Sequence, residues 1–391
     1  MVIHNAKIIT PYRLIHNGSV RIKDGLIQEV FEGEIGISVG EETIDAQGNY
    51  LSPGFIDLHV HGGGGYDFMD ANEQSFAGIT DCHARYGTTA MMPTSLTSDA
   101  DQIEKLHGKY YNLVRNQSKG VRLLGMHLEG PYFAMSQRGA QDPAFIRNPD
   151  ESEYLPLLKK YGHVISRWSA APELPGALLF GSRLTDFGII PSLAHTDAVY
   201  EEILKGMESG FTLATHLYSG MSGMTRKNAY RYAGAIESCL LLDQITVELI
   251  ADGIHLPEPF LKLIVKTKGV DKIILVTDAM RAAGTLLTES ILGDSKHGIR
   301  VIIEQGVAKL PDRSSFAGSI ATANQLIRTM VNVAGVSLIE AVQMITINPA
   351  RIVKRDHEIG SIAVGKKADL VLFDEQIDVK LTMVEGCIIF S

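Results

Sequence analysis

The chain has 391 residues, of which 45% are hydrophobic and 21% charged; these ordinary globular values argue against a disordered or fibrous chain. Its formal net charge of −9 disfavours a nucleic-acid-binding protein, which normally carries a basic surplus. The three cysteines are far apart and show no CxxC spacing, so neither a disulfide framework nor a zinc knuckle is expected. The first residues lack a signal-type apolar segment and no run of about 18 apolar residues occurs, so we expect a soluble, cytoplasmic protein.

The two ends of the chain are predicted to form one small β domain. Both contain short apolar runs separated by turn residues, a pattern typical of antiparallel β structure. Because the two ends share this pattern, we expect them to pair into a β-sandwich made of residues 1–52 and 354–391. The runs are 2–10, 19–22, 26–31 and 42–45 near the start, and 368–373, 379–384 and 387–390 near the end.

The central residues 53–353 alternate short runs rich in Val, Ile, Leu and Thr with longer amphipathic stretches. Strand–helix alternation predicts a parallel sheet. Eight units fit an α/β fold of the (β/α)₈ TIM-barrel type, with strands buried on both faces. A doubly wound open sheet is the alternative. The candidate strands are 55–60, 88–92, 121–128, 164–170, 189–194, 212–215, 246–250 and 272–277, and the helical stretches between them include 99–115 and 198–208.

Polar side chains that can bind metal lie at or just after the carboxyl ends of most of these strands. Barrel enzymes keep their active sites at this face, and packing alone does not need so many such residues there. We therefore expect a functional site at this mouth. The residues are His59 and His61 (first strand), Glu129 (third), His195 (fifth), His216 (sixth), Asp252 and His255 (seventh) and Asp278 (eighth).

The spacing of these residues predicts a catalytic metal site. His59 and His61 are two positions apart on a strand, so both imidazoles face the same way and could reach one cation. Neighbouring parallel strands lie about 4.8 Å apart, so His195 and His216 could converge on one ion. Together with Glu129 they would leave a coordination position for water.

Asp278 has two candidate roles. It could bind a second ion together with His59 and His61, or it could act as general base on water. For His255 a substrate contact is favoured over a structural role.

A cationic stretch, residues 225–231, follows the sixth strand. It contains Arg226, Lys227 and Arg231, for which a phosphate site and a solvated loop are equally good hypotheses. Ser319 precedes a helical run and is expected to be its N-cap.

Taken in chain order, these motifs resemble the amidohydrolase superfamily, and within it the N-acetylglucosamine-6-phosphate deacetylase family. The resemblance covers nearly the whole chain, and several of the motifs are specific to that branch. They are Ser52-Pro53-Gly54-Phe55-Ile56-Asp57-x-His59-x-His61-Gly62, His127-Leu128-Glu129-Gly130-Pro131, 193–198, 215–218, Ala251-Asp252-Gly253-x-His255, 276–279 and Asn348-Pro349-Ala350-Arg351.

The resemblance implies one or two divalent metal ions per subunit (Zn, Fe, Mn or Co). One ion would lie on Glu129, His195 and His216; because His59 and His61 are kept, the chain is similar to the two-metal members, in which Glu129 bridges. Cyclic amidases bridge instead through a carboxylated Lys on strand four, and residues 164–170 contain no Lys. The aspartate that matches Asp278 is the family's proton shuttle.

The resemblance also implies the substrate and its contacts. We expect a metal-dependent deacetylase that hydrolyses N-acetyl-D-glucosamine 6-phosphate to D-glucosamine 6-phosphate and acetate, acting as a homodimer. The alternatives are an N-acetylgalactosamine-6-phosphate deacetylase or other N-acyl amidohydrolase, and a non-catalytic sugar-phosphate-binding relative. The expected contacts are Ala140, Gln141, Ser219, Gly220, Arg226, Lys227, Asp252, His255, Phe316, Ala317 and Gly318.

The chain departs from the family's pattern in three places. Ser219-Gly220 stands where Asn-Ala is frequent, and Gln141 stands where a substrate-facing histidine is usual. Residues 225–231 replace a segment whose arginine reaches the phosphate from the partner subunit. The hydrolytic centre is expected to be intact.

Overall fold

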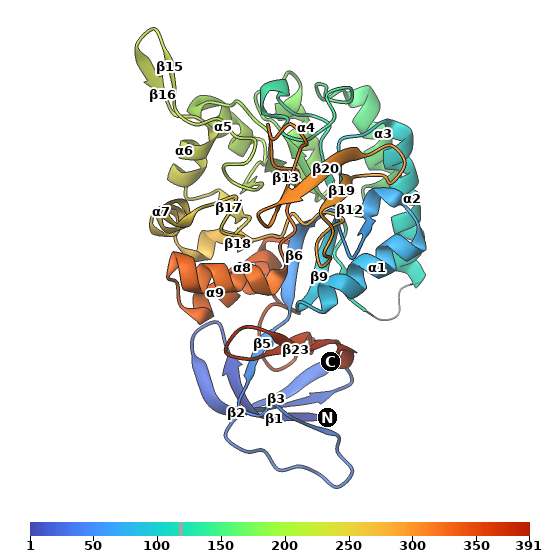
Figure 1. The fold of residues 1–391 in the computed structure, drawn as a ribbon, viewed down its shortest axis with the longest axis vertical. Helices are drawn as coiled ribbons and strands as arrows, with labels where there is room; N and C mark the ends of the chain where they lie inside the picture. Colours follow the sequence, from blue (N-terminus) through green and yellow to red (C-terminus); the bar gives the residue numbers. More distant parts are fainter. Residues whose placement is uncertain (117–119) are drawn as a thin grey trace.

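The two chain ends meet in one sheet that lies beside the main body of the protein (Figure 1). The computed structural model describes residues 1–116 and 120–391. As expected, both termini contribute strands to this sheet; the domain boundaries after residues 52 and 353 stay predictions. The order is β24-β23-β22-β5-β1-β2-β3, with β4 beside β1. The strands are β1 (Val2–Ile9), β2 (Leu14–Lys23), β3 (Leu26–Glu32), β4 (Thr43–Asp45), β5 (Tyr50–Pro53), β22 (Leu370–Phe373), β23 (Val379–Val384) and β24 (Cys387–Phe390).

The expected barrel is confirmed. Eight parallel strands follow one another in the order β6-β9-β11-β12-β13-β14-β17-β18, with β10 as a short addition beside β9. Their side chains are almost all buried, as in a sheet covered on both faces. The strands are β6 (Phe55–Val60), β9 (Thr88–Ser95), β10 (Arg122–Leu123), β11 (Met126–Glu129), β12 (Ile165–Ala170), β13 (Ile190–Leu193), β14 (Leu213–Ala214), β17 (Thr246–Leu249) and β18 (Ile273–Leu275).

The seam between the last and first barrel strands is closed by side chains and loop backbone. The backbone N–H of Asp278 donates to the carbonyl of His59 at 2.9 Å. The Asp57 carboxylate accepts hydrogen bonds from the hydroxyl and the N–H of Thr277, at 2.5 and 3.2 Å. Burial raises the pKa of Asp57 to about 7. The seam therefore fixes the positions of His59 and Asp278, two predicted site residues, relative to each other.

Helices cover the outside of the barrel (Figure 1). Among the described residues, none of the helices has the length and apolar character needed to cross a membrane. The helices are α1 (Glu73–Ala84), α2 (Ala100–Asn116), α3 (Glu151–Tyr161), α4 (Ala177–Asp186), α5 (Tyr200–Glu208), α6 (Ala235–Leu241), α7 (Glu258–Lys268), α8 (Ala323–Thr329), α9 (Leu338–Ile345) and α10 (Ile347–Ile352), with short helical turns η1 (Phe68–Asp70), η2 (Met135–Gln137), η3 (Val270–Lys272) and η4 (Met330–Ala334).

Among the described residues, three small β elements lie outside the barrel and the terminal sheet, and the sequence patterns did not predict them. The hairpin β15 (Thr225–Lys227) and β16 (Tyr230–Tyr232) projects away from the barrel (Figure 1). A three-strand sheet, β19 (Glu289–Leu292), β20 (Ile299–Glu304) and β21 (Val307–Lys309), follows the eighth barrel strand. A two-residue pair, β7 (Gly62–Gly63) and β8 (Tyr66–Asp67), follows the first.

The predicted strand 121–128 is divided in two by Gly125. This residue has φ +102°, a left-handed conformation that favours glycine, and a Cβ here would lie 1.8 Å from the Ser166 hydroxyl. Its N–H leaves the ladder and donates to the Tyr110 hydroxyl at 2.8 Å. The predicted strand took no account of Gly125, although an isolated glycine inside a strand often marks such a break.

The buried imidazole of His107, on α2, is expected to make the stability of the protein sensitive to acid. The ring is fully buried, Nδ1 donates to the Ile103 carbonyl, and burial lowers the pKa of His107 to about 4. The unfolded chain, with a histidine pKa of about 6.5, binds more protons between these values, so stability falls as the pH drops from 6.5 towards 4. Between pH 7 and pH 5 we expect His107 to remove about 2 kcal/mol from the free energy of unfolding.

The measurement is urea unfolding of the wild type and of His107→Gln, which keeps a donor for Ile103 but does not titrate. From pH 7 to pH 5 the wild type should lose about 2 kcal/mol more unfolding free energy than His107→Gln does. If the free energies of unfolding of the two proteins fall equally between pH 7 and pH 5, the buried imidazole of His107 is protonated as readily as in the unfolded chain and the prediction is wrong.

Candidate active site

The predicted site residues line a cavity of about 520 Å³ at the carboxyl end of the barrel. Its wall includes metal-competent side chains from the first, third, fifth, sixth and eighth strand ends. The β19–β21 sheet and the segment after it cover one side, through Leu292, Lys309 and Phe316. The predicted residues on the wall are His61, Glu129, Ala140, Gln141, His195, His216, Ser219, Gly220, His255, Asp278, Phe316 and Gly318.

Six predicted ligands converge at the bottom of this cavity. Three sets of ligand atoms each lie within 4.8 Å of one another. Glu129 with His195 and His216 satisfies the geometric condition on which the metal hypothesis depends. The sets are Glu129, His195 and His216; His59, His61 and Glu129; and His59, His216 and Asp278.

Glu129 lies between the imidazoles, and its two oxygens together reach all four of them. Oε1 is 2.9 Å from His216 Nε2, 3.5 Å from His195 Nε2 and 3.4 Å from His59 Nε2. Oε2 is 3.4 Å from His61 Nε2. Burial opposes ionisation, but the surrounding imidazoles hold the pKa of Glu129 well below its ordinary value. The carboxylate is therefore an anion that can face two cation positions at once.

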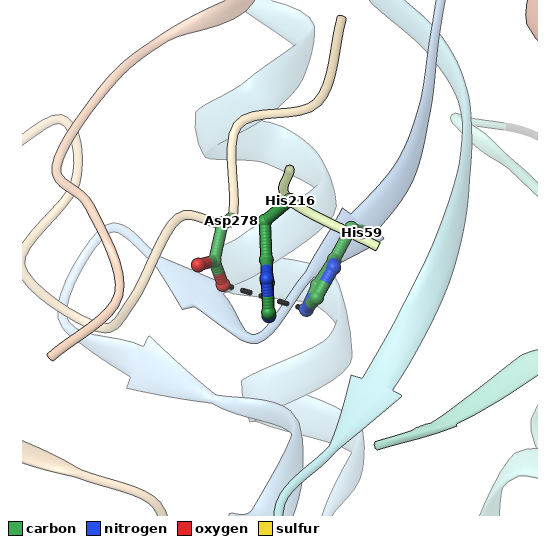
Figure 2. Close-up of side chains that lie close together, drawn as sticks. All are labelled: His59, His216 and Asp278. Carbon is green, nitrogen blue, oxygen red and sulfur yellow. Dashed lines mark ion pairs between the residues drawn. The ribbon is translucent and has the colours of Figure 1, made fainter. Parts of the chain in front are cut away.

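Asp278 approaches the same ring nitrogens of His59 and His61 as Glu129 does. Its Oδ1 is 3.4 Å from His59 Nε2 and 3.2 Å from His61 Nε2. Figure 2 shows His59, His216 and Asp278 pointing toward a common centre from three different strand ends. Burial raises the pKa of Asp278, but His59 and His61 hold it below the ordinary value.

Three of these residues have an unusual backbone conformation that orients their side chains. His195, His216 and Asp278 have φ values of +45°, +30° and +48°, in the left-handed region that non-glycine residues rarely adopt. Such conformations persist where the surrounding structure enforces them, and they concentrate at functional sites. Here they turn the chain as each strand ends, and the side chains remain over the barrel mouth.

Hydrogen bonds to the backbone and close packing fix the fifth-strand ligand. His195 Nδ1 donates to the Gln137 carbonyl at 2.7 Å, which leaves Nε2 toward Glu129. Gly220 packs against the same ring: it has φ +59°, and a Cβ there would lie 2.6 Å from His195 Nδ1. The Ser219-Gly220 pair therefore leaves room for this imidazole.

The donor set fits a divalent cation. His59 Nε2 and His61 Nε2 lie 3.2 Å apart and are both directed at the anionic cluster. Imidazole nitrogens and carboxylate oxygens, with open space on the cavity side, are the ligands of catalytic sites for Zn and related ions. The cluster is a candidate divalent-metal site.

His255 and Gln141 are oriented by neighbours. His255 Nδ1 lies 2.7 Å from Asp252 Oδ2, which directs Nε2 away from Asp252, and the Phe316 ring lies 4.5 Å from the imidazole. Gln141 donates to Glu129 Oε2 at 2.7 Å and accepts from the Thr97 N–H. Asp252 thus lies behind the cavity wall, and the amide of Gln141 is occupied by Glu129.

Some predicted residues lie elsewhere. Arg226 and Lys227 are exposed on the β15–β16 hairpin and do not line this chain's cavity. Ala317 is buried behind the wall. The expectation for Ser319 is wrong: α8 begins after Thr322, and the Ser319 hydroxyl donates to the Thr277 carbonyl instead.

Sequence reasoning missed several residues of the site. Lys309 and Arg313 line the cavity, but no local pattern distinguishes them from other surface cations. Arg167 and Glu248 lie inside the barrel below the metal cluster. Their signal was available, because each is a charged residue inside a predicted barrel strand.

A metal-competent cluster at the mouth of a (β/α)₈ barrel, beside a sheet built from both termini, defines a class of hydrolases. The chain matches the model of the Amidohydrolase family over residues 50–389 and belongs to that family. Within it, the chain is similar to N-acetylglucosamine-6-phosphate deacetylase from Lysinibacillus sphaericus, with 32% identity covering 99% of this chain and 97% of the relative. It is also similar to N-acetylgalactosamine-6-phosphate deacetylase from Escherichia coli O157:H7, with 29% identity and 98% of each chain covered.

Solved structures give the same result. A mutant of N-acetyl-D-glucosamine-6-phosphate deacetylase from Mycobacterium smegmatis, in complex with N-acetyl-D-glucosamine 6-phosphate, superposes with a TM-score of 0.92. The identity is 27%, and the match covers 100% of this chain and 99% of the other. The resemblance inferred from the motifs is therefore confirmed.

Proposed function

We propose that the protein hydrolyses the acetamide of N-acetyl-D-glucosamine 6-phosphate, releasing acetate and D-glucosamine 6-phosphate. The observation that carries this proposal is the convergence of six metal-competent side chains at one cavity. Glu129, His195, His216, His61 and Asp278 line it, and His59 lies buried beside them. The similarity to deacetylases over the full length supports the substrate class.

Each group at the cavity has a role in this reaction. A divalent ion on the cluster would supply positive charge that polarises a carbonyl and acidifies water. Asp278 is ionised and faces the same centre, so it can accept the proton of the attacking water and later return it to the departing amine. His255, oriented by Asp252, lies on the wall where it can donate to the substrate's polar groups.

The identity and number of the ions are part of the proposal. The ligands suit Zn, Fe, Mn or Co alike. Two positions are supported by Glu129, whose two oxygens face different imidazoles. The homodimer and the cytoplasmic location stay predictions of the sequence analysis.

A cation on the cavity wall supports a phosphorylated substrate. Lys309 of β21 lines the cavity near Phe316, and in the described part of the chain its ammonium has no hydrogen bond or ion pair. Arg313 also lines the cavity, although its guanidinium is bound to Glu304. This position supports Lys309 as a candidate phosphate-binding residue supplied by this chain itself.

Replacing Lys309 with Ala is expected to raise KM for the phosphorylated sugar by about 10- to 100-fold with little change in kcat, because a hydrogen bond to a charged group is lost. Steady-state kinetics measure this. Lys296→Ala, an exposed lysine outside the cavity lining, is the control. If instead Arg226→Ala raises KM and Lys309→Ala does not, the phosphate is held by the hairpin.

The experiment that tests the proposed function is acetate release from a panel of N-acetyl sugars after elemental analysis of the protein. N-acetylglucosamine 6-phosphate should be the best substrate, and its unphosphorylated form should be far poorer. Faster turnover of N-acetylgalactosamine 6-phosphate would favour the alternative that the second relative suggests. Absence of acetate release from a metal-loaded protein would favour a sugar-phosphate-binding role.

A further inference from the structure

A buried ion pair fills the inside of the barrel below the metal cluster. Arg167 of β12 and Glu248 of β17 are both fully buried and bind each other through two contacts, one of them Nη2 to Oε2 at 2.8 Å. The interior of such a barrel is normally filled by branched apolar side chains. Removing two charges from water is costly, and an apolar pair of similar volume is often at least as stable. Packing alone does not explain the pair.

All five N–H groups of Arg167 are used inside the barrel. Nε donates to the Ser192 hydroxyl at 2.8 Å, and Nη2 donates to the Thr215 hydroxyl at 2.8 Å and to Glu248. Nη1 donates to Glu248 and to the Leu58 carbonyl at 3.3 Å. No donor remains for a ligand, so Arg167 can act only on the groups that it holds.

Glu248 faces the metal-binding side chains from below. Its Oε2 lies 3.6 Å from His59 Nδ1 and accepts the backbone N–H of His216 at 3.4 Å. Among the described residues, His59 Nδ1 has no hydrogen-bond partner. On the other side of the ring, His59 Nε2 is 3.4 Å from both Glu129 and Asp278. The imidazole thus stands between Glu248 and the metal-binding groups.

Glu248 lies where a metal-bound histidine usually has a hydrogen-bond acceptor. Such a ring usually donates its second N–H to a carboxylate, which fixes the tautomer and the ring orientation. Arg167 donates to both oxygens of the Glu248 carboxyl group. Glu248 is therefore a fixed, charge-paired acceptor in the place where the Nδ1–H of His59 needs one.

We propose that Arg167 and Glu248 form a positioning unit for metal binding. Arg167 fixes Glu248, and Glu248 holds His59 with Nδ1 protonated and Nε2 free for an ion. The unit acts through His59 and does not touch the substrate. Its side-chain contact is with His59, so it governs occupancy of the position formed by His59, His61 and Glu129. At His216 it holds only the backbone N–H, which the amide oxygen of a Glu248→Gln variant can still accept, so the position formed by Glu129, His195 and His216 keeps its ligand atoms.

The test is a Zn²⁺ titration of the metal-free full-length protein in competition with a chelator. Glu248→Gln is expected to weaken binding at one of two positions by about 10- to 100-fold, the usual effect of losing such a partner. The other ion should stay at wild-type affinity. Ser192→Ala is the matched control, since it removes one partner of Arg167 and leaves Glu248 in place; its Zn²⁺ affinities should equal those of the wild type.

A second variant avoids the uncompensated charge that Glu248→Gln leaves on Arg167. In Arg167→Met/Glu248→Gln both charges are gone and the volume is nearly kept, so the barrel is expected to fold. It should show the same selective loss of Zn²⁺ affinity. The proposal is overturned if the folded double variant binds Zn²⁺ at both positions with wild-type affinity. It is also overturned if binding weakens equally at both positions, or if the wild type binds no second ion.

Discussion

Asp278→Asn is expected to lower the deacetylation rate constant by about 10²- to 10⁴-fold, the range that general acid–base catalysis supplies. Asn keeps the shape of the side chain and an oxygen near His61, but it cannot accept the proton of the attacking water. The five other ligands remain, so the metal content should equal that of the wild type. The measurements are acetate release and elemental analysis of the same sample.

The matched control for this prediction is Asp197→Asn. Asp197 follows the fifth strand at the same barrel mouth, bonds Gln137, and does not line the cavity. It should retain activity within about twofold, as a surface polar change does. Near-native turnover by Asp278→Asn would assign the proton transfer to another group. A parallel loss of metal would show that Asp278 acts mainly as a ligand.

The barrel and its strand ends could be predicted from the sequence because their signals are local. Each strand is a short apolar run, and a polar residue such as His59 or Glu129 follows or ends it. Parallel strands bring their carboxyl ends to one face, so position along the chain fixes position at the mouth. This is why side chains far apart in sequence could be assigned to one cluster.

The cover of the cavity could not be predicted in this way. The β19–β21 sheet reaches the mouth through non-local packing, and Lys309 is one of 36 Lys and Arg residues without any distinguishing local pattern. Gln141 was expected to face substrate, and the structure shows its amide bound to Glu129. Whether such an amide binds the substrate or a neighbouring carboxylate depends on residues that only the fold brings next to it.

Glu129→Gln is expected to remove the metal from both positions and to reduce activity at least as strongly as Asp278→Asn. Glu129 belongs to two of the three ligand sets, with Oε1 toward His216 and Oε2 toward His61. A glutamine would replace one oxygen with an N–H donor that cannot bind a cation, and would remove the negative charge. Elemental analysis after gel filtration measures the ions retained per chain.

His195→Asn separates this bridging role from simple ligation. His195 belongs to the set with Glu129 and His216 only, so its loss should release one ion and spare the one near His59. Thermal unfolding of the metal-free proteins checks that both variants fold. If Glu129→Gln loses no more metal than His195→Asn, the carboxylate serves one position and does not bridge. The difference between these two losses of metal is set by geometry, because Glu129 belongs to two ligand sets and His195 to one.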